Sequence, residues 1–348
     1  MGFNFSKIES MKPTRLDYCQ YLLVSQINYT LTNFADHVKN TSHDNVNRYL
    51  RDERLTGSIL WQNVREQVVL SDSGFIVFDD TVVDKDFSHK IELVRRQYSG
   101  NAHGVIKGIG IVNCVYVNPK TEQFWVIDFR IYDPDGDGKS KLDHVEDMLS
   151  NVVRYKCLPF HAVLMDTWYA TKNLMLFIES LHRCYYCPLK DNRLVDDSNG
   201  KNKVYQKVDS LTWSEDELTH GKKIKIRGFP AMHKVKVFRV EVSTHRTDFV
   251  VTNDLSQNST LDTQEVCGWR WKIEQFHREA KQLTGLEKCQ CRKARIQRNH
   301  IACAFLVWVR MAEVARKIGK TLYQLKHGLL DDYLCQQLKN PSIKMKLA

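Results

Sequence analysis

The first seventy residues carry apolar side chains at three- and four-residue spacing, the pattern of amphipathic helices. Ser42 or Asp44 is a suitable N-terminal cap for one of these helices. Val46, Tyr49 and Leu50 then lie on one face of that helix. Short helices of this kind have two interpretations. They form a helix-turn-helix module that binds DNA, or they form a helical cap on the main domain.

The pattern changes to strands after residue 73, where runs of β-branched and aromatic residues are bounded by turn residues. In chain order the segments are strands at 74–80, 105–119 and 122–134, a helix at 142–156, a strand at 160–170, a helix at 171–183 and a strand at 184–190. This order predicts a mixed α/β domain whose sheet has antiparallel and parallel parts.

The second half of the chain continues with a different pattern. Residues 191–260 alternate polar and β-branched runs, which predicts a β-rich insertion. A long helix is expected from about Thr263 to Gln282, and residues 295–335 are again helical. We therefore expect four regions: an N-terminal helical, DNA-binding region at 1–70, the first part of the α/β core at 71–190, the insertion at 191–260, and the completion of the core with C-terminal helices at 261–348.

Charge adds information about partners. The 348 residues include 51 Lys and Arg against 41 Asp and Glu, a net charge of +10. Such an excess favours a polyanionic partner, either nucleic acid or an anionic membrane surface. No apolar run is long enough for a membrane span, and the first residues lack the apolar run of a secretion signal. We expect a cytoplasmic, nucleoid-associated protein without a membrane partner.

Carboxylates stand at three informative places. Asp79 and Asp80 follow the apolar run 75–78, and Asp166 closes the apolar run 162–165. Carboxylates at the ends of neighbouring strands can converge into a cluster of oxygen atoms, which is the kind of site that Mg²⁺ prefers. In isolation, an Asp at the end of a strand is more often a turn former.

A third carboxylate lies on the long predicted helix. Glu274 has Arg270 four residues before it and Lys281 seven residues after it, so the three share one helical face. These residues could form a surface ion-pair stripe. Together with the two strand-end carboxylates, Glu274 could instead complete a site for two metal ions of the kind that supports phosphoryl transfer.

At these residues the chain resembles a known family. Arg270, Glu274 and Lys281 match the Arg-Glu-Lys part of the Tyr-Arg-Glu-Lys signature of cut-and-paste DDE transposases from bacterial insertion sequences. Three further blocks resemble that group: 78–81, 95–101 and 164–170. The resemblance covers roughly residues 70–320 and implies an RNase H-like mixed sheet, with a β-rich insertion before the last catalytic helix and a small N-terminal all-helical domain.

The resemblance implies a catalytic triad of Asp79, Asp166 and Glu274 that holds two Mg²⁺ ions, for which Mn²⁺ substitutes. Asp80 is the alternative to Asp79, because alternation places the two on opposite faces of the strand. Asp79 is preferred, since it directly follows its apolar run as Asp166 does. The signature tyrosine falls on Cys267, which has no phenol, so the route of second-strand cleavage stays open.

The implied reaction is metal-dependent cleavage at transposon ends, followed by strand transfer into target DNA. The partners are double-stranded DNA, as terminal inverted repeats and target, and a second copy of the chain on DNA. Arg270 and Lys281 would hold phosphates near the cleaved bond. Basic residues expected along the DNA backbone are Lys288, Arg292, Lys293, Arg295 and Arg298. Two alternatives remain: an RNase H-like nuclease without strand transfer, and a non-catalytic DNA-binding protein derived from a transposase.

Overall fold

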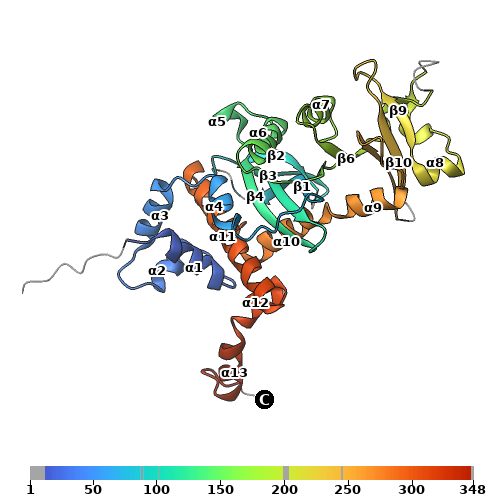
Figure 1. Cartoon of the computed structure of the whole chain (residues 1–348). Helices are drawn as coiled ribbons and strands as arrows, with labels where there is room; N and C mark the ends of the chain where they lie inside the picture. The colour runs from blue at the N-terminus through green and yellow to red at the C-terminus, as the bar shows by residue number, and fades with distance from the viewer. Residues whose placement is uncertain are drawn as a thin grey trace, which may run out of the picture. The chain divides into compact units, whose positions relative to one another are not determined.

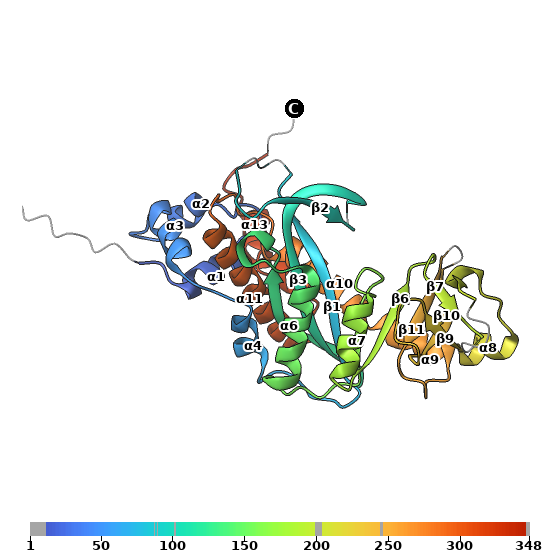
Figure 2. The ribbon, with the colours of Figure 1, turned by 90° about the horizontal axis from the view of Figure 1, so that it is seen from above.

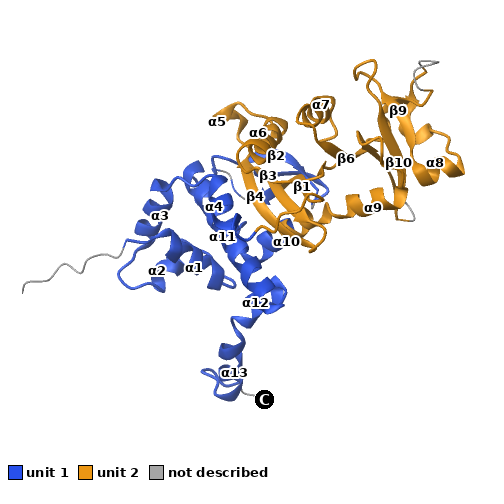
Figure 3. Ribbon diagram, viewed as in Figure 1, with its two compact units in different colours: residues 1–67, 82–109, 277–348 blue, residues 68–81, 110–276 orange. Residues whose placement is uncertain are grey.

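The chain has two compact units in a computed structural model that describes residues 12–86, 88, 90–100, 102–198, 204–243 and 246–345. Unit 1 comprises residues 1–67, 82–109 and 277–348, and unit 2 comprises residues 68–81 and 110–276 (Figure 3). The division falls within strands β1 (Phe75–Asp84) and β3 (Gly104–Asn118) and within helix α10 (Trp271–Leu283). These three elements therefore contribute residues to both units.

Unit 1 is mainly helical and is built on one long helix (Figure 1). Its helices are α1 (Arg15–Val24), α2 (Leu31–Asp36), α3 (His43–Asp52), α4 (Ser58–Val64), α11 (Ala294–Ile318), α12 (Leu322–Gly328) and α13 (Asp331–Lys339). Helices α1, α3 and α4 pack against α11, whose buried side chains include Phe305 and Trp308. The hydroxyl of Ser42 accepts a hydrogen bond from the backbone of Asn45, which confirms Ser42 as the cap of α3.

Asn299 shows how the N-terminal helices are held on α11. Its side-chain amide donates to the carbonyls of Leu50 and Glu53 at 2.7 and 2.6 Å, and its oxygen accepts from the backbone N–H of Leu55 at 2.9 Å. Asn299 is fully buried. The carbonyls at the end of α3 therefore obtain their hydrogen bonds from the C-terminal part of the chain.

Unit 2 contains a mixed sheet, as the sequence predicts. Strand β5 (Ala162–Leu164) pairs in parallel with β1 on one side and with β6 (Cys184–Leu189) on the other, whereas β3 pairs antiparallel with β4 (Gln123–Ile131). Between the strands run the short helix α5 (Pro134–Asp137) and the helices α6 (Lys141–Arg154) and α7 (Lys172–Ser180). The predicted α/β fold class, with parallel and antiparallel parts, is confirmed.

The β-rich segment continues the same sheet. Its elements are β7 (Leu194–Asp196), β8 (Gln206–Lys207), the short 3₁₀ helix Val208–Ser210, α8 (Glu215–His220), β9 (Lys222–Ile226), β10 (Val235–Ser243) and β11 (Arg246–Thr252). Strand β11 pairs antiparallel with β6, and the order continues β10-β9-β7-β8. Figure 2 shows these strands with α8 and α9 (Thr260–Gly268) beside them.

Two local predictions are wrong. Strand β1 does not stop at Asp80 but continues to Asp84, because the β-branched run 81–83 is also buried in strand conformation. The long helix predicted over 263–282 is divided into α9 and α10. Between them the backbone N–H groups of Trp269 and Arg270 bond three residues back, to Val266 and Cys267, which is the tighter 3₁₀ pattern.

Candidate active site

Strand pairing brings Asp79 and Asp166 together. The parallel register of β1 and β5 pairs Phe75 with Ala162 and Val77 with Leu164. Asp79 and Asp166 each lie two residues beyond the last pair of this register, with Asp166 in the turn that follows β5. Burial and the neighbouring carboxylates of Asp166 and Asp80 raise the pKa of Asp79 to about 8. The two aspartates therefore form a close, poorly hydrated pair of oxygen donors.

The turn after β5 holds Asp166 in place. One of its carboxylate oxygens accepts hydrogen bonds from the backbone N–H groups of Trp168 and Tyr169 at 2.9 and 3.2 Å. Burial raises the pKa of Asp166, while the Tyr169 hydrogen bond and Arg270 act in the opposite direction. The carboxylate is thus oriented by the chain that follows it, and its second oxygen is the one suited to an external ligand.

Asp80 is engaged by other protein groups. Its Oδ1 accepts a hydrogen bond from the hydroxyl of Tyr169 at 2.8 Å, and its Oδ2 accepts one from Nζ of Lys141 at 2.5 Å. The Lys141 and Asp80 side chains are only 13% and 18% exposed. Both oxygens of Asp80 therefore have internal partners, which favours Asp79 over Asp80 as a metal ligand.

Arg270 links the third predicted carboxylate to this pair. Its Nη1 lies 2.9 Å from Oε1 of Glu274, one helical turn away. The positive charge of Arg270 also acts to lower the pKa of both Asp79 and Asp166. The guanidinium is therefore the shared counter-charge of Asp79, Asp166 and Glu274.

The donor chemistry of the aspartate pair suits a hard divalent cation. Among the residues that the structure describes, no group of three or more His, Cys, Asp or Glu side chains is arranged to hold a metal ion. Glu274 points its Oε1 to Arg270 instead. Asp79 and Asp166 nevertheless provide desolvated carboxylate oxygens, which a hard divalent cation would stabilise in their charged form.

The remaining predicted site residues lie in unit 1. Nζ of Lys281 donates to the carbonyl of Val82 at 2.7 Å and lies 3.5 Å from a carboxylate oxygen of Glu287. In the basic run, Lys288, Arg292, Lys293 and Arg295 are exposed and Arg298 is half-buried. Lys293 pairs with Glu92 at 2.8 Å. Four of the five cations in this run are therefore accessible to a polyanion.

The basic residues of the β-rich segment at 222–227, a second run that could contact DNA, include two lysines with internal partners. Lys222 is buried, and its Nζ lies 3.2 and 3.1 Å from carboxylate oxygens of Asp197 and Glu217. Nζ of Lys225 donates to the carbonyl of Ala231 at 2.8 Å. These two lysines serve the packing of the β-rich segment.

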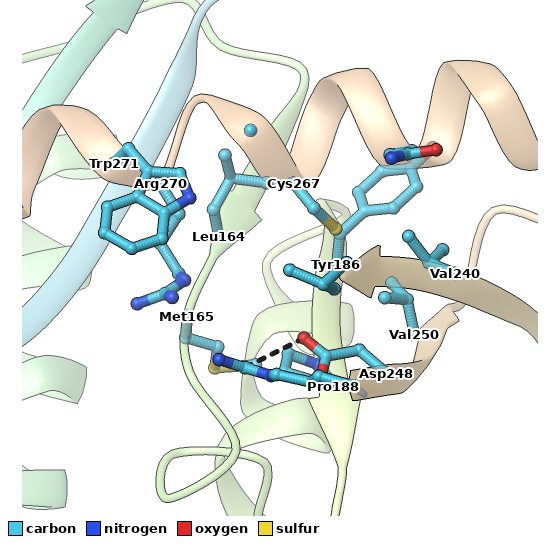
Figure 4. A pocket seen from close by; sticks show the side chains of 14 residues that line it. Leu164, Met165, Tyr186, Pro188, Val240, Asp248, Val250, Cys267, Arg270 and Trp271 are labelled. Atoms are coloured by element: carbon cyan, nitrogen blue, oxygen red, sulfur yellow. Dashed lines mark hydrogen bonds and ion pairs between the residues drawn. The ribbon is translucent and has the colours of Figure 1, made fainter. Parts of the chain in front are cut away.

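A pocket of about 260 Å³ adjoins Arg270 in unit 2 (Figure 4). Leu164, Met165, Tyr186, Cys267, Arg270 and Trp271 are among its lining residues. Arg246 and Asp248 form an ion pair at 2.9 Å in its wall. Burial raises the pKa of the Cys267 thiol to about 12, so the residue at the position of the signature tyrosine is a neutral, apolar wall group.

Sequence reasoning missed the partners of Asp80. Tyr169 lies three residues after Asp166, so its position near the aspartates could have been inferred from the turn that ends β5. Lys141 is separated from Asp80 by 61 residues, and no pattern in the chain connects the two. Arg246 and Asp248 stand two apart on β11, where alternation predicts a shared face but not a pocket.

Comparison with known proteins identifies one family model. Residues 66–310 match the family model described as "Transposase DDE domain". No match is found among curated proteins.

Three solved structures resemble the chain at low sequence identity. The piggyBac transposase synaptic complex with hairpin DNA is 12% identical, with 97% of this chain and 77% of that chain covered and a TM-score of 0.46. Endonuclease V of Ciona intestinalis in complex with DNA is 10% identical, with coverages of 74% and 95% and a TM-score of 0.28. The catalytic domain of human endonuclease V is 11% identical, with coverages of 64% and 96% and a TM-score of 0.31.

The described helices include none with the length and apolarity needed to cross a membrane. The family match spans well over half of the chain and includes Asp79, Asp166 and Glu274. The chain therefore belongs to the family of DDE transposases.

Proposed function

We propose that this transposase cleaves DNA at transposon ends and transfers the freed strand into target DNA with two Mg²⁺ ions. The observation that supports this most directly is the parallel pairing of β1 with β5, together with the effect of the Asp166 carboxylate in raising the pKa of Asp79. The proposed ligands are Asp79 and Asp166, with Glu274 completing one site. When bound, two such ions stabilise the attacking and leaving oxygens of an in-line phosphoryl transfer.

Arg270 and Glu274 have linked roles in this proposal. In the structure the Glu274 carboxylate is paired with Arg270 at 2.9 Å. If Glu274 turns toward the aspartates, the guanidinium is left with donors suited to a DNA phosphate, which it binds through two parallel hydrogen bonds. Lys281 is proposed as a second phosphate contact, which requires it to leave the carbonyl of Val82.

The proposed partners follow from the same reaction. They are double-stranded DNA, as terminal inverted repeats and as target, and a second copy of the chain that holds the other transposon end. Exposed cations of the run 288–298 would contact the phosphate backbone, so binding should weaken as salt concentration rises. The proposed location is the cytoplasm, in association with the nucleoid.

Cleavage of a DNA fragment that contains the coding gene and its flanking sequence tests this proposal. The wild type is compared in Mg²⁺, Mn²⁺ and EDTA with Asp79→Asn, Asp166→Asn and Glu274→Gln. We expect metal-dependent nicks at two inverted flanking repeats and joined products with target DNA, all lost in the three variants. Asp80→Asn is the matched control, because it removes the neighbouring charge on the same strand, and it should keep metal-dependent cleavage.

Each other outcome has a definite meaning. Cleavage without joined products would identify a nuclease. Binding without cleavage would identify a non-catalytic DNA-binding protein. Loss of cleavage in Asp80→Asn but not in Asp79→Asn, with both variants folded, would reverse the assignment of the first ligand.

A further inference from the structure

A two-stranded ribbon in unit 1 has an unusual outer face. Strand β2 (Arg95–Ser99) pairs antiparallel with the first part of β3. In this register Arg96 stands opposite Lys107, and Tyr98 stands opposite Val105. The two pairs are two residues apart, so their side chains lie on the same face of the ribbon. The face therefore combines two cations with an aromatic and an aliphatic side chain.

This face is open to solvent. Tyr98 is 62% exposed and Val105 is 58% exposed. Arg96 is also exposed and Lys107 is half-buried, whereas Ser99 on the opposite face is buried. On the opposite face Arg95, Gln97 and Ile106 are half-buried, so the face with Tyr98 and Val105 is the more exposed side of the ribbon.

Packing of the protein itself does not account for this composition. Like charges directly opposite each other on an antiparallel pair are destabilising. Strand β2 is the last strand in the order of the sheet, and charges on such an edge strand can prevent pairing with another chain. That role explains Arg96 but not the exposed Tyr98 and Val105 beside it. A polyanion that also offers apolar surface would stabilise all four side chains at once.

The base of the ribbon is held firmly. A Cβ added at Gly108 would lie 2.6 Å from the carbonyl oxygen of Val83, so the two backbones approach closely enough to require glycine. The carbonyl of Lys107 accepts from the backbone N–H of Lys85 at 2.9 Å, and the Gln97 amide donates to the carbonyl of Gly108 at 3.0 Å. The cation on Lys107 therefore projects from an ordered backbone, which lowers the entropic cost of binding.

We propose that the β2–β3 ribbon binds double-stranded DNA through Arg96, Lys107, Tyr98 and Val105. Arg96 and Lys107 contact phosphates, while Tyr98 and Val105 pack against the sugars and base edges between them. A two-stranded ribbon has dimensions that the major groove accommodates. This inference rests on the proposed function only in taking DNA as the substrate, and it assigns a contact surface outside the carboxylate site.

Binding of a labelled duplex, measured by fluorescence anisotropy at several salt concentrations, tests the proposal on the full-length chain. Arg96→Ser with Lys107→Ser should reduce the slope of log affinity against log salt by about 2, roughly one for each lost phosphate contact. Tyr98→Ala should weaken binding about tenfold without changing the slope, because it removes packing and no charge. The double variant should have a thermal midpoint no lower than that of the wild type, since it removes a repulsive pair.

A matched control removes the same charge elsewhere in unit 1. Arg310 and Lys317 on α11 are exposed and pair with Glu313 at 2.7 and 2.6 Å, so Arg310→Ser with Lys317→Ser should leave the salt slope unchanged. An equal loss of slope in this control would show a general charge effect and overturn the assignment. A ribbon variant that self-associates but binds DNA like the wild type would overturn it in favour of edge protection.

A measurement on the wild type removes any dependence on how the variants fold. Lys107 should be protected from acetylation, detected by mass spectrometry, when the duplex is bound, whereas Lys317 should not. Equal labelling of Lys107 with and without DNA would contradict the proposal. Protection without any cleavage activity would leave the ribbon assignment intact while the proposed reaction fails.

Discussion

Asp79 and Asp80 are neighbours on strand β1 but have different surroundings at the candidate site. Burial and the carboxylate of Asp166 raise the pKa of Asp79, whereas Asp80 is bound by Tyr169 and Lys141. Strand alternation accounts for the separation, because successive side chains point to opposite faces. The sequence could show that the two aspartates point to opposite faces of the strand. It could not show that Asp80 has the half-buried Lys141 as its partner.

The contacts of Asp80 with Tyr169 and Lys141 should contribute to the stability of the fold. Lys141→Met removes the cationic partner of Asp80 and should lower the free energy of unfolding by about 2 kcal/mol, the range for hydrogen bonds to charged groups. Tyr169→Phe removes one hydrogen bond to the same carboxylate and should cost about 1 kcal/mol. Urea unfolding measures both. Equal stability of the Lys141→Met variant and the wild type would show that the pair is an unimportant surface contact.

A buried histidine in unit 1 should make stability depend on pH. The carbonyl of Gly285 can only accept, so Nε2 of His300 carries the proton, and Nδ1 accepts from the hydroxyl of Tyr18 at 2.8 Å. Burial lowers the pKa of His300 to about 4, against 6.5 ordinarily. Between these values the unfolded chain binds a proton that the folded chain does not. Stability is therefore full above pH 6.5 and is lost as pH falls toward 4.

The expected loss is about 3 kcal/mol for this one group, at about 1.4 kcal/mol for each pKa unit. It can be measured as the free energy of unfolding in urea between pH 7 and pH 4. The His300→Gln variant, which does not titrate, should show a shallower dependence than the wild type. An equal change in the free energy of unfolding between pH 7 and pH 4 in the two proteins would contradict the prediction.

At the scale of elements, the turn after α10 depends on a glycine. Gly285 has a φ of +72°, and an added Cβ would lie 2.3 Å from the ring of Tyr29. Gly285→Ala should therefore destabilise the chain by about 2 kcal/mol through backbone strain and overpacking. Gly268 at the end of α9 is a matched control, because an added Cβ there meets no atom within 4 Å. Gly268→Ala should raise stability by about 0.5 kcal/mol. Urea unfolding should show a lower free energy of unfolding for Gly285→Ala and a higher one for Gly268→Ala. Equal losses in the two variants would contradict the prediction.

Strand positions were predictable where β-branched and aromatic residues are dense, as in β3 and β4. The end of β1 was not, because Asp79 and Asp80 resemble a turn while the residues after them continue the strand. The break between α9 and α10 carries no helix-breaking proline. It depends on local hydrogen bonds that periodicity does not report.

At the scale of the whole molecule, the N-terminal helices share a compact unit with the C-terminal helices. Nζ of Lys326 donates to the carbonyls of Leu22 and Leu23 at the end of α1, at 3.2 and 2.6 Å. Asn299 makes the equivalent contacts at the end of α3. The carbonyls at the C-terminal ends of α1 and α3 thus accept hydrogen bonds from side chains more than 200 residues away in the sequence.

A fragment of residues 1–70 should therefore not fold alone. It lacks the capping groups and the apolar face of α11, so buried carbonyls and core side chains such as Leu50 would be exposed. We expect circular dichroism to show no cooperative thermal transition for the fragment, in contrast to the full chain. A sharp transition would show that the region is an independent domain, as the sequence predicts.

The sequence by itself determined the mixed α/β class, the chemistry of the candidate ligands and membership in the DDE transposase family. Local patterns carry this information, because strand composition, helix spacing and short motifs act over a few residues. The tertiary structure decided that Tyr169 and Lys141 bind Asp80, that Arg270 pairs with Glu274, and that the N-terminal helices pack on α11. These features depend on register and on contacts between residues far apart in the chain, and no local pattern specifies them.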